Sequence, residues 1–310
     1  MISPVVLKTF FDRQIACWPQ AAARYADLAK VDKRIIKISG FPVILQHNPL
    51  RAVSTNASVD AVSVASRPCF LCRENRPAEQ IVLDVVEGYD ILVNPYPIFP
   101  MHFTISAKKH RPQCDVDLGV AMDMALHLHG FVVFFNGANA GASAPDHLHL
   151  QAGNSDFLPI VAYAETHEGE LMSVEGGTKI FAMDQLPMYA VHFISDTDFR
   201  VVQRWIDWLL PDDNNGMPNR DLRNLLFWAD SSNRLHTLFF PRIKHRPDRY
   251  YAVDDSRMLV SPGAVDMSGV LILPRRVDFE RVSRADVINI YDEVGFRYKD
   301  SPRLKSLLLL

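Results

Sequence analysis

Short apolar runs joined by short links constrain the fold of this chain more than any other feature. Short links favour antiparallel pairing, because parallel strands need a long crossover. The strands alternate irregularly with helical patterns, so the chain is predicted to be α+β, with an antiparallel sheet flanked by helices. The predicted strands lie at residues 34–46 (with a turn at Gly40), 90–93, 103–106, 131–135, 147–151, 225–228, 235–240 and 270–273, and the predicted helices at 5–29 (broken or kinked at Pro19), 115–129, 198–210 and 278–294.

Composition narrows the class of protein. The 310 residues are enough for about two domains, or for one domain built from two similar halves. The 33 basic and 36 acidic side chains give a net charge of −3, which argues against a general nucleic-acid binder. No apolar run approaches the roughly 18 residues of a membrane-spanning helix, and the first residues lack the layout of a signal peptide. A soluble, cytoplasmic protein without a nucleic-acid or membrane partner is therefore expected.

An internal similarity predicts a duplication. Residues 102–112 and 236–247 each contain a histidine, an apolar strand and then the sequence Lys-His-Arg-Pro, with one extra residue in the second copy. Glycines cluster in the polar stretch 167–178 between the two copies. We therefore predict an N-terminal half at residues 1–170 and a C-terminal half at 171–310.

Two His-x-His pairs have different meanings because their predicted secondary structures differ. His127 and His129 lie in a helical pattern, where residues two apart point in different directions and cannot share a ligand. His147, His149 and Gln151 alternate along a predicted strand, so they share one face while the leucines between them turn into the core. Such a polar row is useful as a site, although a hydrogen-bonded, solvent-facing strand remains the alternative.

The loop before this row has almost no bulky side chains. It runs from Asn136 to Pro145 and consists mainly of Gly, Ala, Asn and Ser. A small-residue loop lets backbone N–H groups approach an anion closely, and Ser143 could add a hydroxyl. Its position directly before the histidine row suggests a phosphate held beside an imidazole nucleophile.

Together with Cys69-Phe-Leu-Cys72 and the segment 94–110, the run from Asn136 to Gln151 resembles the galactose-1-phosphate uridylyltransferase branch of the histidine triad (HIT) superfamily. That branch includes hexose-1-phosphate uridylyltransferases, diadenosine tetraphosphate phosphorylases and GDP-hexose phosphorylases. The resemblance covers roughly residues 45–155, with a looser fit at 240–247 and 269–274. It implies a HIT-like catalytic first half, and a HIT-like second half that completes the substrate pocket.

The resemblance implies a role for each residue of the row. His149 corresponds to the nucleophile that takes a nucleoside monophosphate, with its other ring nitrogen bonded to a backbone carbonyl. Gln151 stands where the hydrolytic members have a third histidine, which implies transfer to phosphate or a sugar phosphate rather than to water. Asn136 and Ser143 match positions that contact the substrate phosphates.

Two basic residues are weaker candidates for substrate binding. Arg51 precedes the cysteine pair by a distance similar to that of the family's phosphate-contacting arginine, but it could equally be a solvated surface residue. Lys244, in the basic segment 242–246, could contribute positive charge toward a polyphosphate. His102 is interpreted as a packing or capping residue.

Cys69 and Cys72 have the spacing of a metal-binding pair. On spacing alone they could also be a redox pair or two unconnected thiols. The family resemblance adds His110 and His147 as the two further ligands, which implies a structural zinc ion.

These features predict a nucleotidyltransferase that forms a covalent nucleotidyl-histidine intermediate. Phosphorolysis of an NDP-hexose (of the GDP-hexose type) or of a dinucleoside polyphosphate is favoured over hexose-1-phosphate uridylyl transfer, because the motif reads His-Leu-His-Leu-Gln rather than the His-Pro-His of the uridylyltransferases. Phosphate or a sugar phosphate would be the acceptor, and a homodimer is a further expectation. A non-catalytic nucleotide-binding protein is the alternative of another class.

Overall fold

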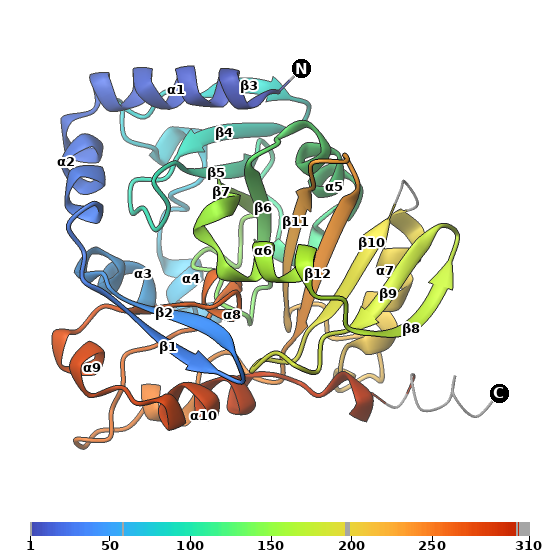
Figure 1. Ribbon diagram of the computed structural model, residues 1–310. Helices are drawn as coiled ribbons and strands as arrows, with labels where there is room; N and C mark the ends of the chain where they lie inside the picture. Colours follow the sequence, from blue (N-terminus) through green and yellow to red (C-terminus); the bar gives the residue numbers. More distant parts are fainter. Residues whose placement is uncertain (1, 58, 196–198, 302, 304–310) are drawn as a thin grey trace.

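Two β-sheets organise the computed structural model, which describes residues 2–57, 59–195, 199–301 and 303 (Figure 1). The larger sheet has ten strands, each pairing antiparallel with its neighbours, and the smaller has three. Together with the helices around them, they confirm the predicted α+β class. The strands of the large sheet are β3 (Leu83–Val86), β4 (Tyr89–Val93), β5 (His102–Ala107), β6 (Phe131–Asn136), β7 (His149–Asn154), β8 (Glu170–Glu175), β9 (Thr178–Ala182), β10 (Val191–Ser195), β11 (Arg223–Ala229) and β12 (Leu235–Pro241).

The strand order of the large sheet repeats. One half runs β3-β4-β5-β7-β6 and the other β8-β9-β10-β12-β11, and pairing of β6 with β11 joins them. In each half a helix, α5 (Leu118–His127) or α7 (Phe199–Leu209), precedes the fourth strand along the chain. The repeat supports a duplication, whereas a boundary between residues 170 and 171 stays a prediction.

The sequence similarity that suggested the duplication links strands that are not equivalent. His102 lies on β5, the third strand of its half, whereas His236 lies on β12, the fourth strand in the order β8-β9-β10-β12-β11. The counterpart of β5 is β10. That pairing of residues 102–112 with 236–247 was therefore wrong, although the repeated strand order is present.

The N-terminal segment forms two helices and a hairpin. Helix α1 (Pro4–Cys17) is capped by Ser3, whose hydroxyl oxygen accepts a hydrogen bond from the Val6 N–H, and α2 (Pro19–Leu28) begins at the proline predicted to break the helix. Strands β1 (Lys33–Ile38) and β2 (Phe41–His47) turn at Gly40, whose positive φ suits glycine. Strand β13 (Val270–Leu273) adds to β2 in parallel, so the small sheet joins an N-terminal hairpin to a strand more than 200 residues later in the chain.

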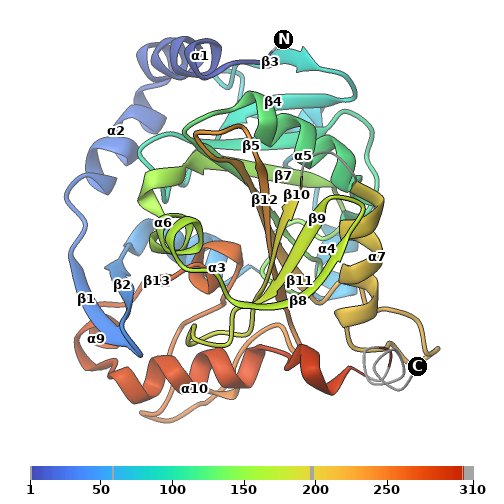
Figure 2. The ribbon, with the colours of Figure 1, turned by 45° about the vertical axis from the view of Figure 1, so that its right-hand side comes forward.

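Hydrophobic cores cover both faces of the large sheet. On one face α1, α5 and α7 pack, and Leu148 and Leu150 belong to this core. The small sheet, α6 (Pro159–Thr166), α8 (Ala264–Met267) and α10 (Arg284–Val294) pack on the other. Because side chains alternate along a strand, His149 and Gln151 face this second side. Figures 1 and 2 both show α1 and α10 at opposite ends of the molecule.

The remaining elements are short. The predicted helix at 278–294 is two helices, because Ser283 caps α10 and ends the run from α9. The short elements are α3 (Ala52–Thr55), α4 (Ala61–Ser66), α9 (Arg276–Arg281) and the 3-10 helices η1 (Pro49–Arg51), η2 (Arg73–Asn75), η3 (Gln113–Asp115), η4 (Ser155–Phe157), η5 (Asp248–Tyr250) and η6 (Tyr298–Asp300).

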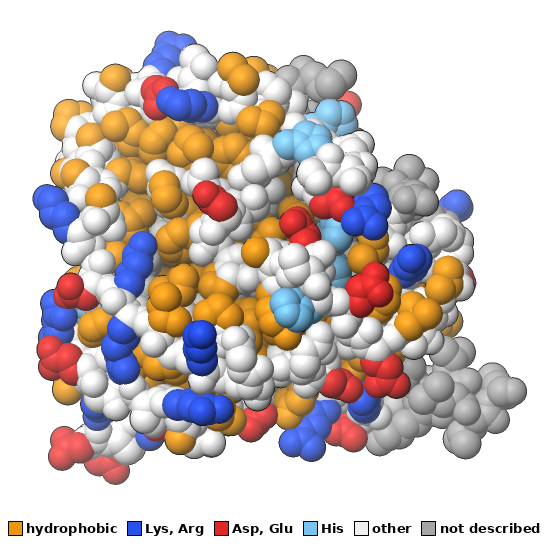
Figure 3. Space-filling view, viewed as in Figure 1, with side chains coloured by type: hydrophobic (Ala, Val, Ile, Leu, Met, Phe, Trp, Pro, Cys, Tyr) orange, Lys and Arg blue, Asp and Glu red, His pale blue; other side chains and the backbone are white. Residues whose placement is uncertain are grey.

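Both outer strands of the large sheet pair irregularly. The ladder between β3 and β4 shifts register between Leu83 and Val86, and the ladder between β8 and β9 shifts between Leu171 and Ser173. On the face shown in Figure 3, hydrophobic side chains gather at the centre and upper left, and charges of both signs mix along the margin. Among the described residues, no helix combines the length and apolar character needed to cross a membrane.

Candidate active site and metal cluster

His149 opens β7 and is almost completely buried, at 5% exposure. Its Nδ1 lies 2.8 Å from the backbone oxygen of His147, which can only accept, so Nδ1 carries the proton. Burial lowers the pKa of His149 to about 4, which keeps the ring neutral at pH 7. The lone pair is therefore on Nε2, as a nucleophilic imidazole requires.

Gln113 holds the backbone at this point, and the sequence analysis did not identify it. Its Oε1 accepts from the His149 N–H at 2.9 Å, and its Nε2 donates to the carbonyls of His149 and Asn136. Gln113 is fully buried in η3. It thus bridges the end of β6 and the start of β7, where the loop leaves the sheet.

Gln151 lies two residues after His149 on the same strand. Its Oε1 is 3.0 Å from Nε2 of His102, which lies on the neighbouring strand β5. His102 is therefore hydrogen-bonded to the row and is more than a packing residue. The strand begins at His149, so His147 lies in the bend before it rather than in the ladder.

Asn136 ends β6 and joins the loop to the second half of the chain. Its Oδ1 accepts from the Ala264 N–H at 2.7 Å and from Asn224 Nδ2 at 2.9 Å. Ser143 is half-buried in the same loop. Asn136 and Ser143 thus lie on the segment between β6 and the His149 strand.

Close packing accounts for the small residues of the loop. A Cβ on Gly137 would lie 2.4 Å from the Asp221 carbonyl oxygen, and one on Gly141 (φ +95°) would lie 2.7 Å from Gly263 Cα. Gly137 N–H and Asn139 N–H also donate to carbonyls of residues 223 and 221. These two donors hold the loop against the second half and are therefore not available to an anion, whereas an anion held by other N–H groups of the loop stays a prediction.

The two basic candidates have different surroundings. Arg51 donates to the Tyr96 carbonyl at 2.9 Å, and its charge contributes to lowering the pKa of His102, so it lies close to the row rather than on an open surface. The Lys244 ammonium pairs with Asp248, at 2.7 Å, and with Glu293. The contacts of Lys244 therefore join it to surface carboxylates, and they do not connect it to His149.

A buried polar network continues from Asn136 into the second half. Arg242, which is fully buried, donates to Asn224 Oδ1 at 2.5 Å and to the Pro262 carbonyl at 2.9 Å. Nearby, burial raises the pKa of Asp266 to about 6, while its carboxylate accepts from two backbone N–H groups. The sequence marked the segment around Arg242 as basic, but it carried no signal for this role.

Cys69, Cys72, His110 and His147 form one cluster. Their ligand atoms all lie within 4.8 Å of one another. Cys69 Sγ is 3.2 Å from His147 Nδ1, and Cys72 Sγ is 3.2 Å from His110 Nδ1. The structure thus brings together the four residues that the sequence and the resemblance proposed as ligands.

The cluster has the donor set and the surroundings of a metal site. Nε2 of His147 lies 2.8 Å from the Ala107 carbonyl oxygen, which fixes the proton on Nε2 and leaves Nδ1 as a lone pair facing the sulfurs. Two thiols and two imidazoles are the set that tetrahedral zinc prefers. The guanidinium of Arg111, which follows His110 in the chain, donates to the Tyr89 hydroxyl rather than contacting the cluster.

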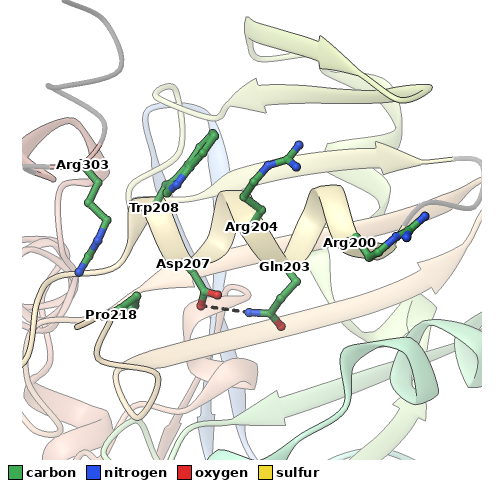
Figure 4. A pocket seen from close by; sticks show the side chains of 7 residues that line it. All are labelled: Arg200, Gln203, Arg204, Asp207, Trp208, Pro218 and Arg303. Atoms are coloured by element: carbon green, nitrogen blue, oxygen red, sulfur yellow. Dashed lines mark hydrogen bonds between the residues drawn. The ribbon is translucent and has the colours of Figure 1, made fainter.

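A separate pocket of about 450 Å³ lies along α7 (Figure 4). Its acidic and basic side chains are paired: Asp207 accepts from Gln203 at 3.0 Å and pairs with Arg220, and Arg204 pairs with Glu175. None of the candidate site residues and none of the four cluster residues lines this pocket, so it is separate from the candidate site at β7. The lining residues are Arg200, Gln203, Arg204, Asp207, Trp208, Pro218 and Arg303.

Comparisons with known proteins concern the fold of this chain. Residues 10–154 match a family described as a domain of unknown function (DUF4922). No curated protein matches the chain at a significant level. The fold is similar to that of yeast Ap4A phosphorylase Apa2, with a TM-score of 0.57 and 15% identity over 90% of this chain and 94% of that one. The structure of that enzyme in complex with Ap4A gives a TM-score of 0.55 and 14% identity over 90% and 96%.

An ADP-glucose phosphorylase from Arabidopsis thaliana also matches, with a TM-score of 0.38 and 13% identity over 82% of this chain and 99% of that one. Because these identities are low, the comparison shows a similarity of fold alone. The similarity of fold rests on the yeast structures, whose TM-scores are 0.57 and 0.55. The chain therefore has the fold of the yeast Ap4A phosphorylase, in agreement with the resemblance that its motifs predicted.

Proposed function

We propose that this chain is a nucleotidyltransferase of the phosphorylase type that works through a nucleotidyl-His149 intermediate. One observation carries the proposal: the imidazole of His149 is held by the His147 carbonyl with its lone pair on Nε2, two residues before an amide on the same strand face. A neutral imidazole attacks phosphorus without a separate base.

In the first step, His149 Nε2 attacks the α-phosphorus of the donor. An N–P bond forms, and the bond from that phosphorus to the bridging oxygen breaks. The leaving group departs as a sugar 1-phosphate or a nucleoside polyphosphate. Nδ1 keeps its proton, and its hydrogen bond to the His147 carbonyl stabilises the positive charge that develops on the ring.

In the second step, an oxygen of inorganic phosphate attacks the same phosphorus. The N–P bond breaks, the electron pair returns to Nε2, and a nucleoside diphosphate leaves. Asn136 supports binding here, because its Oδ1 already accepts two hydrogen bonds and its NH2 group is the part that can donate to a phosphate oxygen. Ser143 and Arg51 are further candidates for phosphate contacts, and Lys244 has no support from its contacts.

Two donor classes fit this chemistry: dinucleoside polyphosphates and NDP-hexoses of the GDP-hexose type. The shared fold with yeast Ap4A phosphorylase, which has been seen with AMP and with Ap4A, supports the first class. Hexose-1-phosphate uridylyl transfer would use the same intermediate with a sugar phosphate as acceptor. The identity of the acceptor distinguishes the two reactions.

We also propose that Cys69, Cys72, His110 and His147 hold a structural zinc ion. The four ligand atoms and the hydrogen bond from His147 Nε2 to a carbonyl support it. A zinc ion there would tether the cysteine loop to the bend that carries His147.

The proposal is tested by incubating the protein with donors that are radiolabelled at the α-phosphate. After denaturation we expect label on the protein that is stable in alkali and released by acid, as a phosphoramidate should be. The label should leave as a nucleoside diphosphate when phosphate is added. Ap4A, GDP-hexose, ADP-hexose and UDP-hexose are the donors to compare.

His149→Ala should abolish the label, and His167→Ala is the matched control because His167 is exposed at the end of α6. If no donor labels the wild-type protein while nucleotides still bind, the chain is a nucleotide-binding protein without turnover. Equal labelling of His149→Ala and the wild type would show that His149 is not the nucleophile.

A further inference from the structure

The hydrogen bond between the buried His102 and the partly buried Gln151 determines which way the Gln151 amide faces. His102 opens β5 and is completely buried. Its ring lies edge-on to Phe99, with centroids 5.2 Å apart, and 6.0 Å from the ring of Phe134. The packing therefore limits the movement of the imidazole.

The proton of this imidazole is assigned by its neighbours. Burial and the charge of Arg51 lower the pKa of His102 to about 3, so the ring is neutral and carries one N–H. The Ile98 backbone N–H points at Nδ1 from 3.2 Å, and a backbone N–H can only donate. Nδ1 is therefore the acceptor, and the proton lies on Nε2.

The protonated nitrogen in turn orients Gln151. Nε2–H of His102 can only donate, and its partner at 3.0 Å is Gln151 Oε1. Turning the amide over would place its NH2 group against the Nε2–H, donor against donor. None of the hydrogen bonds among the described residues uses Gln151 Nε2, so this NH2 group remains for a ligand.

We propose that His102 is a positioning residue that keeps the NH2 group of Gln151 turned toward the transferred phosphoryl group, an inference that deepens the proposed nucleotidyl transfer and rests on it. Gln151 and His149 share a strand face, so the amide lies on the side that the nucleophile faces. A phosphoryl oxygen needs a donor there, and an amide turned the other way would present its carbonyl oxygen to the anion.

The second half of the chain provides a matched comparison. His102 lies opposite Gly153, two residues past Gln151, and His192 lies opposite Leu238, two residues past His236. Nε2 of His192 is 2.9 Å from Nδ1 of His236, so the same diagonal hydrogen bond recurs there. His192 is equally buried, but its partner is not the glutamine that follows a candidate nucleophile.

The tautomer can be measured without any assumption about function. Nitrogen-15 correlation spectra of histidine-labelled protein should show His102 with its proton on Nε2, unchanged between about pH 5.5 and pH 8. His102→Gln identifies the signal by its disappearance. A proton on Nδ1, or a doubly protonated ring in this range, would overturn the positioning role whatever the protein catalyses.

The kinetic consequence is measured on the rate of label formation. His102→Phe, which removes the donor, should lower the maximal rate about 10- to 100-fold while the donor concentration for half-maximal rate changes less than about threefold. His102→Gln, whose amide still offers an N–H near the position of Nε2, should recover most of the rate. His192→Phe, which breaks the equivalent bond in the second half, should label at the wild-type rate.

The failures of the two proposals are distinguishable. If the wild type forms no label, the nucleotidyl transfer fails and the tautomer measurement alone decides how Gln151 is oriented. If the wild type labels and His102→Phe labels equally fast, the positioning role is overturned and the transfer stands. If His102→Phe does not fold, His102→Gln decides. Labelling by His102→Gln at the wild-type rate supports the positioning role. A loss of rate of about 10- to 100-fold in His102→Gln contradicts it.

Discussion

At the scale of single residues, three side-chain amides belong to the strand ends and the turn that carry the candidate nucleophile. The hydrogen bonds of Gln113 fix the backbone of His149. The side-chain oxygens of Asn136 and Gln151 each accept hydrogen bonds, which leaves the NH2 group of each amide for a ligand. The sequence predicted His149, Gln151 and Asn136 because they lie in one run. It did not identify Gln113, and it named His102 only as a packing or capping residue, because the contacts of a single buried residue follow no periodic pattern.

Gln113→Ala should weaken both stability and transfer. It leaves the N–H and the carbonyl of His149 and the carbonyl of Asn136 without their partner. Unpaired buried backbone groups cost about 2 kcal/mol, so we expect a loss of that order in the free energy of unfolding, together with slower labelling.

The measurements are denaturant unfolding and the labelling rate at saturating donor. Gln80→Ala is the control, because Gln80 also donates to a backbone carbonyl, that of Val93, without contacting β7. A Gln113→Ala protein that labels at the rate of Gln80→Ala would show that the amide does not position His149.

At the scale of elements, the sequence predicted most strands correctly, including the one that carries His149 and Gln151. It missed β3, β8, β9 and β10, and it started β7 too early, because the bend at His147 is set by the cysteine cluster rather than by local preference. His147 faces two ways: its ring joins the cluster, and its backbone oxygen holds His149.

Loss of the metal should therefore impair transfer as well as stability. The purified protein should contain about one equivalent of zinc, and chelation or Cys72→Ser should lower both the melting temperature and the labelling rate, because the bend at His147 loses its anchor. Cys114→Ser is the control, since Cys114 is exposed and outside the cluster. Less than about half an equivalent in protein prepared without chelators would contradict the zinc site.

At the scale of the whole molecule, two halves with one strand order contain one candidate nucleophile. Two residues before His236, just ahead of β12, the second half has Arg234, where the first half has His149 before Gln151. Arg234 is exposed and paired with Asp230. The halves thus share an architecture, but only the first has a histidine at that position.

Labelling should accordingly reach no more than one nucleotidyl group per chain. The ratio is measured by counting the label against the protein concentration at saturating donor, and by mapping the labelled peptide. A ratio near two, or label on a peptide from β12, would show a second reactive site. An Arg234→Ala protein should retain the full ratio.

The folded state should lose stability in mild acid. Burial lowers the pKa of His102 and of His192 to about 3, whereas in the unfolded chain both return to about 6.5. Between about pH 6.5 and about pH 3 the unfolded chain binds more protons at these two histidines than the folded protein does. Their contribution to the free energy of unfolding is therefore complete above about pH 6.5 and declines as the pH falls toward 3.

Melting temperatures at pH 7 and pH 5 test this, with His192→Gln as the comparison. His192 faces His236, which lies 3.3 Å from Asp230, and removing its titration should reduce the difference between the two temperatures. An identical pH dependence in His192→Gln would show that this imidazole titrates normally in the folded protein.

The pairing of β6 with β11 also affects how this protein meets copies of itself. Two separate five-stranded sheets would expose four edges, whereas the joined sheet exposes two, on β3 and β8. Both remaining edges are interrupted by register shifts, and such irregular edges are poor templates for another strand. Growth of the large sheet from chain to chain is thereby discouraged at both ends, so we expect a homodimer not to form by pairing of β3 or β8 with a strand of another copy.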